Sequence, residues 1–186
     1  MKKFIFFLLL SSLVVGQSET ASTPMVWWVD HKNGDDSNSG ATEETAVKTV
    51  YKAMKNIGWF NGDTIKVKPA LNSDGTLHYY DFKNEEINLN TSNNFVLIGT
   101  GGADSTIFDA RNTNRHFTFD DGQSSETIIK GITFKNGYAD NWPGAGSIFL
   151  HRQLQIQFID CTWESNSTNG QEGGGAIIIR EGATPS

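Results

Sequence analysis

Short runs of apolar residues alternate with clusters of Gly, Asn, Asp and Ser from Ile65 to the end of the chain. Short strands bounded by turn residues are typical of an all-β protein. The same pattern begins at residues 25–29, where Met-Val-Trp-Trp-Val precedes a polar, glycine-containing loop over residues 30–40. The pattern therefore predicts strands along most of the chain.

One segment has a helical period instead. Apolar side chains recur at spacings of three and four over residues 45–58, where Thr45 is placed to cap the helix and Gly58 to end it. The helix has one apolar face. We expect it to cover the open end of the strand stack, because an uncovered end exposes apolar core and unpaired strand edges.

Internal matches show how the strands are connected. Residues 131–134 match residues 160–163, and residues 146–150 match residues 175–179, both at an offset of 29 residues. A common offset means that the whole path of the chain repeats, as in one coil of a solenoid. Alternation along the strands then predicts one inward row, made of Phe117, Phe119, Ile148, Leu150, Ile177 and Ile179.

Four motifs in the N-terminal part follow one another in a recognisable order. They are Val29-Asp30, the loop Asn33 to Gly40, Lys48-Thr49-Val50 and the strand start Gly62-Asp63-Thr64-Ile65. This order resembles the N-terminal cap and first coil of secreted pectin-lyase-like proteins. The resemblance implies a right-handed parallel β-helix with an N-terminal capping helix. It implies no particular activity, since that fold carries lyases, hydrolases, adhesins and proteins without known chemistry.

The last coil contains a second set of signatures. Trp163-Glu164-Ser165-Asn166 followed by Gly174-Gly175-Ala176-Ile177 resembles the FxxN and GGAI signatures of polymorphic outer membrane protein repeats, with Trp in place of Phe. The preceding coil departs from this pattern in residues 134–136, which are one residue short, and in residues 144–147, which lack Gly-Gly-Ala. The resemblance supports the coil geometry and implies an adhesin-like role in surface attachment.

The N-terminus predicts export. Two lysines precede an apolar run that ends near Val15, which is typical of a signal peptide over residues 1–16. The run is too short to cross a bilayer, so we expect a chain that does not span a membrane and is secreted, extracellular or at the cell surface. A mobile leader is expected over residues 17–24, a strand, loop and capping helix over residues 25–62, and β-helix coils over residues 63–186.

The C-terminal end of the sequence has no predicted cap. Few residues follow the last apolar strand before Ser186. Because stacked repeats need capped ends, we expect the chain to be truncated at the C-terminus, with further coils or a partner covering that end.

Charge and cysteine usage narrow the function classes. The net charge of −6 argues against nucleic-acid binding, which requires clustered Lys and Arg. Cys161 is the single cysteine, so an intrachain disulfide is excluded, and its apolar strand context predicts a small buried hydrophobic residue. Asn90 and Asn166 begin acceptor triplets that could be glycosylated if the source is a eukaryote.

The aligned strands place three polar residues one after another. If Phe119, Leu150 and Ile179 stack, the following residues, Asp120, His151 and Arg180, form a ladder about 4.8 Å apart. This ladder is the candidate catalytic group, in which Arg binds a sugar carboxylate and His or Asp moves a proton. The alternative is a purely structural set of cross-strand charge pairs.

Two further sets of residues are candidates for binding. The loop after the first strand offers oxygen ligands for a possible calcium ion in Asp30, Asn33, Asp35, Asp36 and Asn38. An Asx-turn loop without metal explains the same composition. Tyr79, Tyr80 and Trp142 are candidate aromatic platforms for sugar rings, with core packing as the alternative.

These features favour a non-catalytic, secreted β-helix module for surface attachment or carbohydrate contact. The alternative is the N-terminal part of a polysaccharide lyase or glycoside hydrolase that acts on acidic polysaccharide. Neither the clustered acidic residues of calcium-dependent lyases nor the Gly-His-Gly segment of the hydrolases occurs in the sequence.

Overall fold

A computed structural model describes residues 23–56, 61–89, 92–120, 122–140, 144–152, 154–170 and 173–180. The predicted signal peptide, most of the predicted leader, Gly58, Asn90 and Trp142 lie outside these residues.

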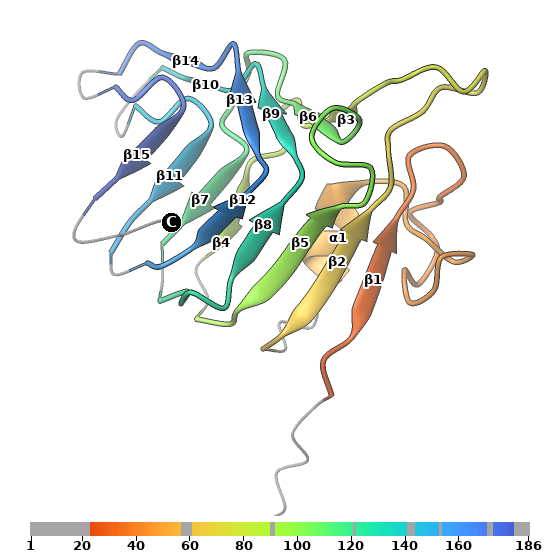
Figure 1. Ribbon diagram of the computed structural model, residues 1–186. Coiled ribbons are helices and arrows are strands. Elements are labelled where there is room, and N and C mark those ends of the chain that lie inside the picture. The colour runs from red at the N-terminus through yellow and green to blue at the C-terminus, as the bar shows by residue number, and fades with distance from the viewer. Residues whose placement is uncertain are drawn as a thin grey trace, which may run out of the picture.

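The chain winds through three parallel sheets and forms a β-solenoid of about four turns (Figure 1). The first sheet has the order β1 (Val26–Val29), β2 (Asp63–Val67), β5 (Phe95–Gly99), β8 (Ile128–Lys130) and β12 (Gln157–Ile159). The second contains β3 (Tyr80–Asp81), β6 (Ile107–Asp109), β9 (Thr133–Lys135) and β13 (Thr162–Glu164). The third contains β4 (Ile87–Leu89), β7 (Phe117–Phe119), β11 (Ile148–Leu150) and β15 (Ile177–Ile179). A two-stranded pair joins β10 (Tyr138–Ala139) and β14 (Ser167–Thr168).

One turn of the solenoid runs from the first sheet through the second and third and back to the first. Ile65, Leu97, Ile129 and Phe158 are register partners in the first sheet, so the turns are 32, 32 and 29 residues long (65 to 97, 97 to 129 and 129 to 158). The last spacing equals the offset in the sequence. The parallel β-helix prediction is confirmed, whereas the right-handed sense stays a prediction.

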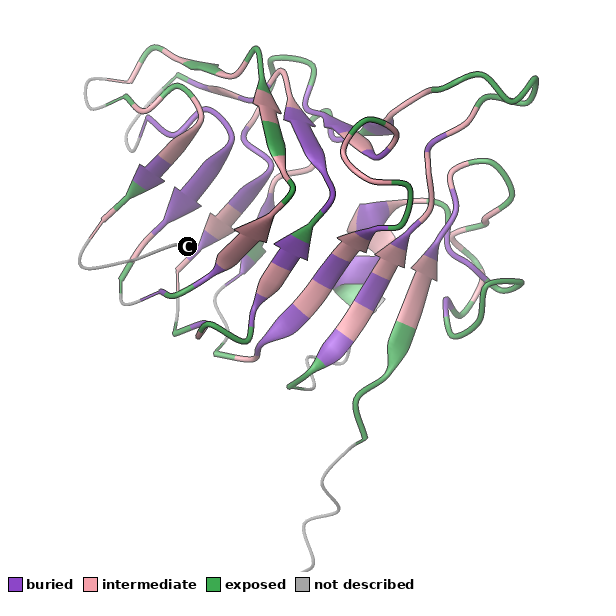
Figure 2. Cartoon of the chain, in the orientation of Figure 1, coloured by how far each residue is buried: buried purple, intermediate pink, exposed green. Residues whose placement is uncertain are grey.

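The predicted strand register is confirmed in both repeated segments. Phe134 pairs with Trp163, and Leu150 pairs with both Phe119 and Ile179. Phe119 and Leu150 are 0% exposed, because each has a coil above and below it. Figure 2 shows the expected alternation of buried and less buried residues along β2 and β5.

The helix is shorter than predicted. It spans α1 (Val50–Asn56), and its inward side places Val50, Ala53 and Met54 in the core. Thr45 does not cap it. The backbone of Val47 instead exchanges hydrogen bonds with β1, accepting from the Asp30 N–H and donating to the Trp28 carbonyl, so this part of the chain is held extended.

The side chains of Thr49 and Asp36 cap the N-terminus of the helix in place of Thr45. The Thr49 Oγ1 accepts a hydrogen bond from the Lys52 N–H at 3.1 Å, as an N-cap does. The Asp36 Oδ1 accepts from the backbone N–H groups of Lys48 and Thr49 at 2.8 and 2.9 Å. The predicted role of α1 as a cap over the solenoid end stays a prediction.

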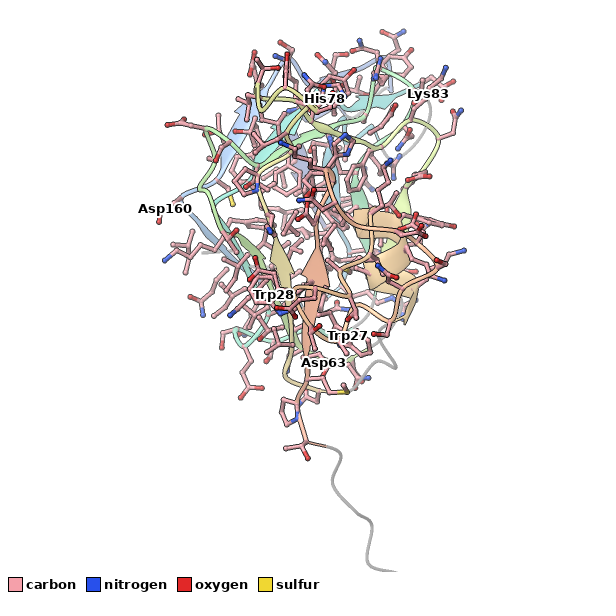
Figure 3. All side chains as sticks on the ribbon, turned by 90° about the vertical axis from the view of Figure 1, so that its right-hand side faces the viewer. Trp27, Trp28, Asp63, His78, Lys83 and Asp160 are labelled. Atoms are coloured by element: carbon pink, nitrogen blue, oxygen red, sulfur yellow. The ribbon has the colours of Figure 1, made fainter. Side chains whose placement is uncertain are left out.

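Asp63, at the start of β2, has a buried carboxylate that holds β1 in place. It is 0% exposed, and its carboxylate accepts hydrogen bonds from the backbone N–H of Met25 at 2.8 Å and the indole N–H of Trp27 at 3.2 Å. These contacts fix β1 beside β2 at the end of the first sheet, which faces the viewer in Figure 3. The Asp of the Gly-Asp-Thr-Ile motif is therefore a structural residue here.

Candidate functional site

The predicted ladder lies at the ends of β7, β11 and β15. The His151 backbone N–H donates to the Phe119 carbonyl, and the Arg180 N–H donates to the Leu150 carbonyl, each at 2.9 Å, so the three residues follow one another in neighbouring strands. The side chains of two of them meet, since His151 Nδ1 lies 2.5 Å from Asp120 Oδ1. Arg152 Nε lies 3.7 Å from the same oxygen.

The Asp120–His151 pair is partly open to solvent. The side chain of Asp120 is 44% exposed and that of His151 is 22% exposed. The His151 ring also stacks on Phe149, with centroids 5.6 Å apart and an interplanar angle of 16°. The arrangement can orient an imidazole for proton transfer, and it equally fits a cross-strand charge pair at a strand end.

Hydrogen bonds within the loop and to the start of α1 occupy oxygen atoms of the three candidate aspartates, while the amides of Asn33 and Asn38 act as donors. Asp35 Oδ1 accepts from the Ser37 N–H and hydroxyl, Asp36 binds the start of α1, and the Asn38 amide donates to the Ala46 carbonyl. Asp30 Oδ1 accepts from the N–H groups of Lys32 and Asn33. Within the described residues, no group of three or more His, Cys, Asp and Glu side chains is placed to hold a metal.

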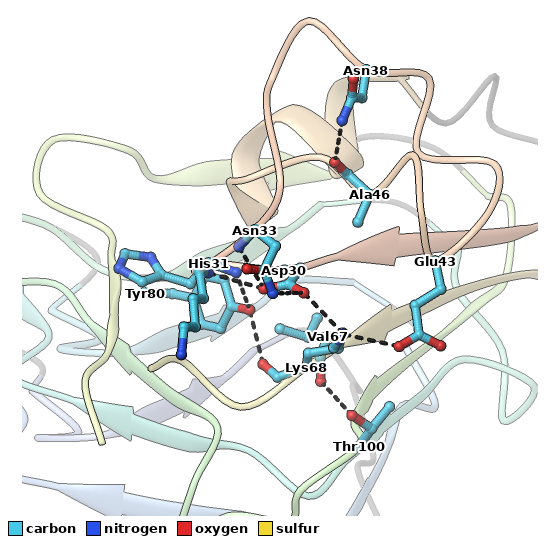
Figure 4. A network of polar contacts seen from close by, with 11 residues as sticks. Asp30, His31, Asn33, Asn38, Glu43, Ala46, Val67, Lys68, Tyr80 and Thr100 are labelled. Carbon is cyan, nitrogen blue, oxygen red and sulfur yellow. Dashed lines mark hydrogen bonds and ion pairs between the residues drawn. The ribbon is translucent and has the colours of Figure 1, made fainter. Parts of the chain in front are cut away.

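A lysine provides the positive charge beside these oxygens. Lys68 Nζ lies 2.9 Å from Asp30 Oδ2 and 2.9 Å from Glu43 Oε1, between the two carboxylates (Figure 4). Burial raises the pKa of Asp30, but hydrogen bonds from Lys68 and Asn33 outweigh it and leave the pKa below its ordinary value. The loop is therefore held by its own hydrogen bonds and by Lys68.

The aromatic candidates separate into two environments. Tyr80 is 2% exposed, so the prediction that it is a sugar platform is wrong. Its hydroxyl donates to the Lys68 carbonyl at 2.8 Å and accepts from the His31 N–H at 3.2 Å. Tyr79, the preceding residue, lies just before β3 and is half-buried.

Tyr79 belongs to a surface of basic and aromatic groups that the sequence did not predict. Its ring lies 4.1 Å from the His78 ring, and the His78 ring lies 5.1 Å from the His31 ring. The guanidinium of Arg111 lies 4.6 Å from the Tyr79 ring centre and donates to its hydroxyl. We call this surface the basic strip; its residues are His31, Lys32, Lys48, His78, Tyr79 and Arg111.

The basic strip contains a surface pocket of about 430 Å³. Polar side chains surround it, and Leu71 supplies apolar surface; the lining residues are His31, Lys32, Asn33, Lys48, Leu71, Asn72, Ser73 and His78. Figure 3 shows His78 at the upper margin of the end of the molecule that carries β1. The chain has a net charge of −6 with its histidines counted as neutral, and the residues that line this pocket include two lysines and two histidines but no Asp or Glu.

The pocket could not be found by motif, because its two sides are far apart in the sequence. His31 and Lys32 follow β1, whereas His78 belongs to the connection between β2 and β3. The solenoid brings the two segments together by stacking β1 on β2, with Val29 opposite Val67. The available signal was compositional: two histidines, each next to a Lys or a Tyr, in polar connections.

The predicted glycosylation site at Asn166 is part of the coil packing. Its Oδ1 accepts from the Gly137 N–H at 2.7 Å, and its Nδ2 donates to the Phe134 carbonyl at 2.9 Å. The signature asparagine therefore ties one coil to the preceding one.

Cys161 is half-buried, and burial raises the pKa of its thiol, as expected for a packing residue.

Comparisons with known proteins identify no relative of this chain. No protein-family model matches it, and neither a curated protein nor a solved structure does. Among the described residues, no helix has the length and apolar character needed to span a membrane.

Proposed function

We propose that this protein is a secreted, non-catalytic β-helix module that contacts carbohydrate through the basic strip. The observation that carries the proposal is the continuous line of ring and guanidinium contacts from His31 through His78 and Tyr79 to Arg111, next to the polar pocket. Sugar rings pack on aromatic and guanidinium planes, and their hydroxyl groups hydrogen-bond to amides such as Asn33 and Asn72.

The strip is held by partners that leave its pocket side open. Arg111 forms an ion pair with Asp81 at 3.2 Å, and the His31 backbone is bonded to the buried Tyr80 hydroxyl. Lys32, Asn33 and Lys48 are exposed, and His31 and His78 are partly exposed. A preformed surface of this kind loses little conformational entropy on binding, which favours affinity.

Binding of polysaccharides to the full chain, measured by isothermal titration calorimetry, tests the proposal. Tyr79→Ala should weaken binding about tenfold, because a stacking surface worth about 1.4 kcal/mol is lost. Tyr138→Ala is the matched control, since Tyr138 is also half-buried but lies in β10, outside the strip. Equal losses in both variants, or no binding of any polysaccharide by the unmodified chain, would refute the proposal.

The alternative is the N-terminal part of a polysaccharide lyase or glycoside hydrolase. It is supported by the 2.5 Å contact between Asp120 and His151, which orients an imidazole at the end of β11. Release of soluble products from an acidic polysaccharide, assayed with and without added calcium, distinguishes the two functions. Product formation that requires His151 would favour the enzyme, and binding without any product favours the module.

A further inference from the structure

The outer face of the first sheet is a broad surface that contributes no residue to the basic strip. Its five strands lie side by side at the front of Figure 1. The inward residues Ile65, Leu97 and Ile129 are 0% exposed, so the residues on either side of each point outward. The register gives two outward rows, which are Trp28, Lys66, Ile98, Lys130 and Ile159, and beside them Val26, Thr64, Val96, Ile128 and Gln157.

Both rows are in contact with water. All ten side chains belong to residues that are at least partly exposed, and Figure 2 shows the outward positions of β2 and β5 as intermediate between the buried ones. Most of the ten are aliphatic or aromatic, and each lies next to its partners in the neighbouring strands. Contiguous apolar surface that stays exposed marks interaction sites on proteins.

The charge on this face is positive. Lys66 and Lys130 are the only charged residues in the two rows. Lys66 Nζ lies 4.9 Å from the Trp28 ring centre, and Lys66 forms no ion pair with a described residue. Lys130 Nζ lies 4.0 Å from Asp160 Oδ2, and these two side chains are 50% and 77% exposed. Because so exposed a pair is weak, both ammonium groups are available to an anionic ligand.

The register also determines the spacing of the two charges. Neighbouring strands lie about 4.8 Å apart, so Lys66 and Lys130, which are two strands apart, are separated by about 9.6 Å along the row. Ile98 lies between them, and Ile159 follows Lys130. The row therefore alternates positive and apolar positions and has Trp28 at one end.

A linear polysaccharide with a carboxylate on every second sugar has the complementary pattern. One sugar of such an extended chain is about as long as one strand spacing, so its carboxylates recur at about the distance between the two lysines. The carboxylates form charge-assisted hydrogen bonds with ammonium groups. The apolar faces of the sugars pack on isoleucine side chains and stack on an indole ring.

We propose that the outer face of the first sheet binds a linear acidic polysaccharide whose carboxylate recurs on every second sugar. The polysaccharide lies along the row from Trp28 to Ile159, across the strands. The inference goes beyond the proposed function and does not depend on it, because this face lies outside the basic strip. The row selects its ligand by the spacing of the negative charges as well as by their sign.

A hyaluronan decasaccharide and its methyl ester are the probes for the full chain. They share one sugar backbone, and only the unesterified form has a negative charge on alternate sugars. Isothermal titration calorimetry should show about tenfold tighter binding of the acid than of the ester, because two exposed ion pairs form with the acid alone. Equal affinities for the two ligands would overturn the inference.

Three double variants, each checked for folding by circular dichroism, test the two lysines and their spacing. Lys66→Gln/Lys130→Gln should lower the affinity for the acid to that for the ester. Lys83→Gln/Lys135→Gln is the matched control, which removes the same charge away from this face and from the basic strip, and it should keep the full affinity. Lys66→Ile/Ile98→Lys keeps the composition but moves one charge beside Lys130, and it should lose most of the preference for the acid.

Two results with these variants would contradict the inference. A similar loss of affinity in the control variant would show that net charge alone is responsible. Unchanged preference for the acid in the folded exchange variant would show that the spacing of the charges does not select the ligand.

Lysine acetylation of the unmodified chain, mapped by mass spectrometry, does not depend on the variants being folded. The decasaccharide should protect Lys66 and Lys130 and leave Lys135 reactive. Protection of Lys32 and Lys48 alone would overturn this inference and support binding at the basic strip. Protection of Lys66 and Lys130 that rises with protein concentration in the absence of sugar would show that a second copy of the chain covers the face, which also overturns it.

The outcomes keep this inference separate from the proposed function. If the decasaccharide does not bind, the inference fails, while the basic strip is still tested by the other polysaccharides and by Tyr79→Ala. If the decasaccharide binds and protects Lys66 and Lys130 while Tyr79→Ala weakens no polysaccharide, the inference stands and the proposed role of the basic strip fails.

Discussion

The middle coil and the last coil contain the same residue types in register, yet they bury them differently. Leu150 of β11 is 0% exposed, whereas its partner Ile179 of β15 is 47% exposed. Figure 2 shows the same contrast, with β11 buried along its length and β15 exposed at its end. A core position in a solenoid is therefore buried by its neighbouring coils and not by its own sequence alone.

The second sheet shows a weaker contrast, since Phe134 is buried and its register partner Trp163 is half-buried. Phe134 is 0% exposed and stacks on Trp163, with ring centres 5.7 Å apart. The indole Nε1 of Trp163 is buried and has no hydrogen-bond partner among the described residues. That further coils or a partner cover this end of the stack stays a prediction.

The largest expected effect comes from a charge placed in the middle coil. Leu150→Asp should abolish cooperative folding, because an unpaired buried carboxylate costs more free energy than a domain of this size has available. Ile179→Asp, its register partner, should lower the free energy of unfolding by about 1 kcal/mol or less, since water reaches that position. Circular dichroism and urea denaturation measure both. A similar loss of unfolding free energy in the two variants would contradict the conclusion that neighbouring coils determine burial.

The next effect concerns the outer face of the same strand. Phe149 points away from the main core, so alternation alone predicts that Phe149→Asp is tolerated. The structure corrects this, because Phe149 is 6% exposed and forms a second apolar cluster with Ala145 and Ile178. We now expect Phe149→Asp to reduce the free energy of unfolding by about 3 kcal/mol.

Ile98→Asp is the control for this substitution. Ile98 also points outward, from β5, but it is only partly buried and lies between Lys66 and Lys130 in the neighbouring strands. An aspartate there gains two favourable cross-strand pairs, so the change in unfolding free energy should stay within about 0.5 kcal/mol. A loss as large as that of Phe149→Asp would show that outward positions in general are intolerant.

Phe149 also shows how far the sequence could predict the structure. The repeat offset predicted that Phe119, Leu150 and Ile179 pair, as they do. The period-two alternation predicted that they face inward, and Phe119 and Leu150 are buried, whereas Ile179 is 47% exposed. Neither signal describes the connections, and it is Ala145, in the connection before β11, that packs on the outer side of Phe149. Thr45 failed as a cap for a related reason, because β1 provides partners for the backbone of Val47.

The basic strip could not be predicted from the sequence either, because the repeat and the alternation do not describe the connections between strands. It combines two connections from different turns, and only the stacking of β1 on β2 brings His31 next to His78. By contrast, the Asp120–His151 contact was predictable, since both residues follow strands whose register the repeat determines.

Two histidines next to the third sheet, the buried His116 and the partly exposed His151, should differ in how they affect the pH dependence of stability. His116 is 0% exposed, with its ring nitrogens 3.0 Å from the Ser147 hydroxyl oxygen and 2.9 Å from the Phe108 carbonyl oxygen. Burial lowers its pKa to about 4. The unfolded chain, with a pKa near 6.5, therefore binds this proton more readily than the folded protein does.

Stability should consequently decrease as the pH falls. The contribution of His116 is fully present above about pH 6.5 and is lost by about 1.4 kcal/mol per pH unit between about pH 6.5 and 4, or about 2 kcal/mol at pH 5. Urea denaturation at a series of pH values measures this slope. His151→Gln should retain the loss, because His151 lies at a partly exposed strand end. A stability independent of pH between 6.5 and 4.5 would contradict the assignment.

The smallest effect is expected at the ladder of Asp120, His151 and Arg180. Replacing all three by Thr, a good strand former, should change the free energy of unfolding by about 1 kcal/mol or less, because partly exposed charge pairs are screened by solvent and salt. Binding of acidic polysaccharide should remain intact, since the strands that carry the ladder contribute no residue to the basic strip.

Arg180→Ala makes this last prediction sharper. If the ladder were the ligand site, removing a guanidinium that binds a sugar carboxylate would abolish binding and leave the fold intact, since a bidentate partner contributes more to affinity than to an exposed strand. If the ladder is structural, calorimetry of Arg180→Ala should give the affinity of the unmodified chain, whereas Tyr79→Ala should not. Selective loss of binding in Arg180→Ala would therefore transfer the site from the basic strip to the third sheet and favour the enzyme over the binding module.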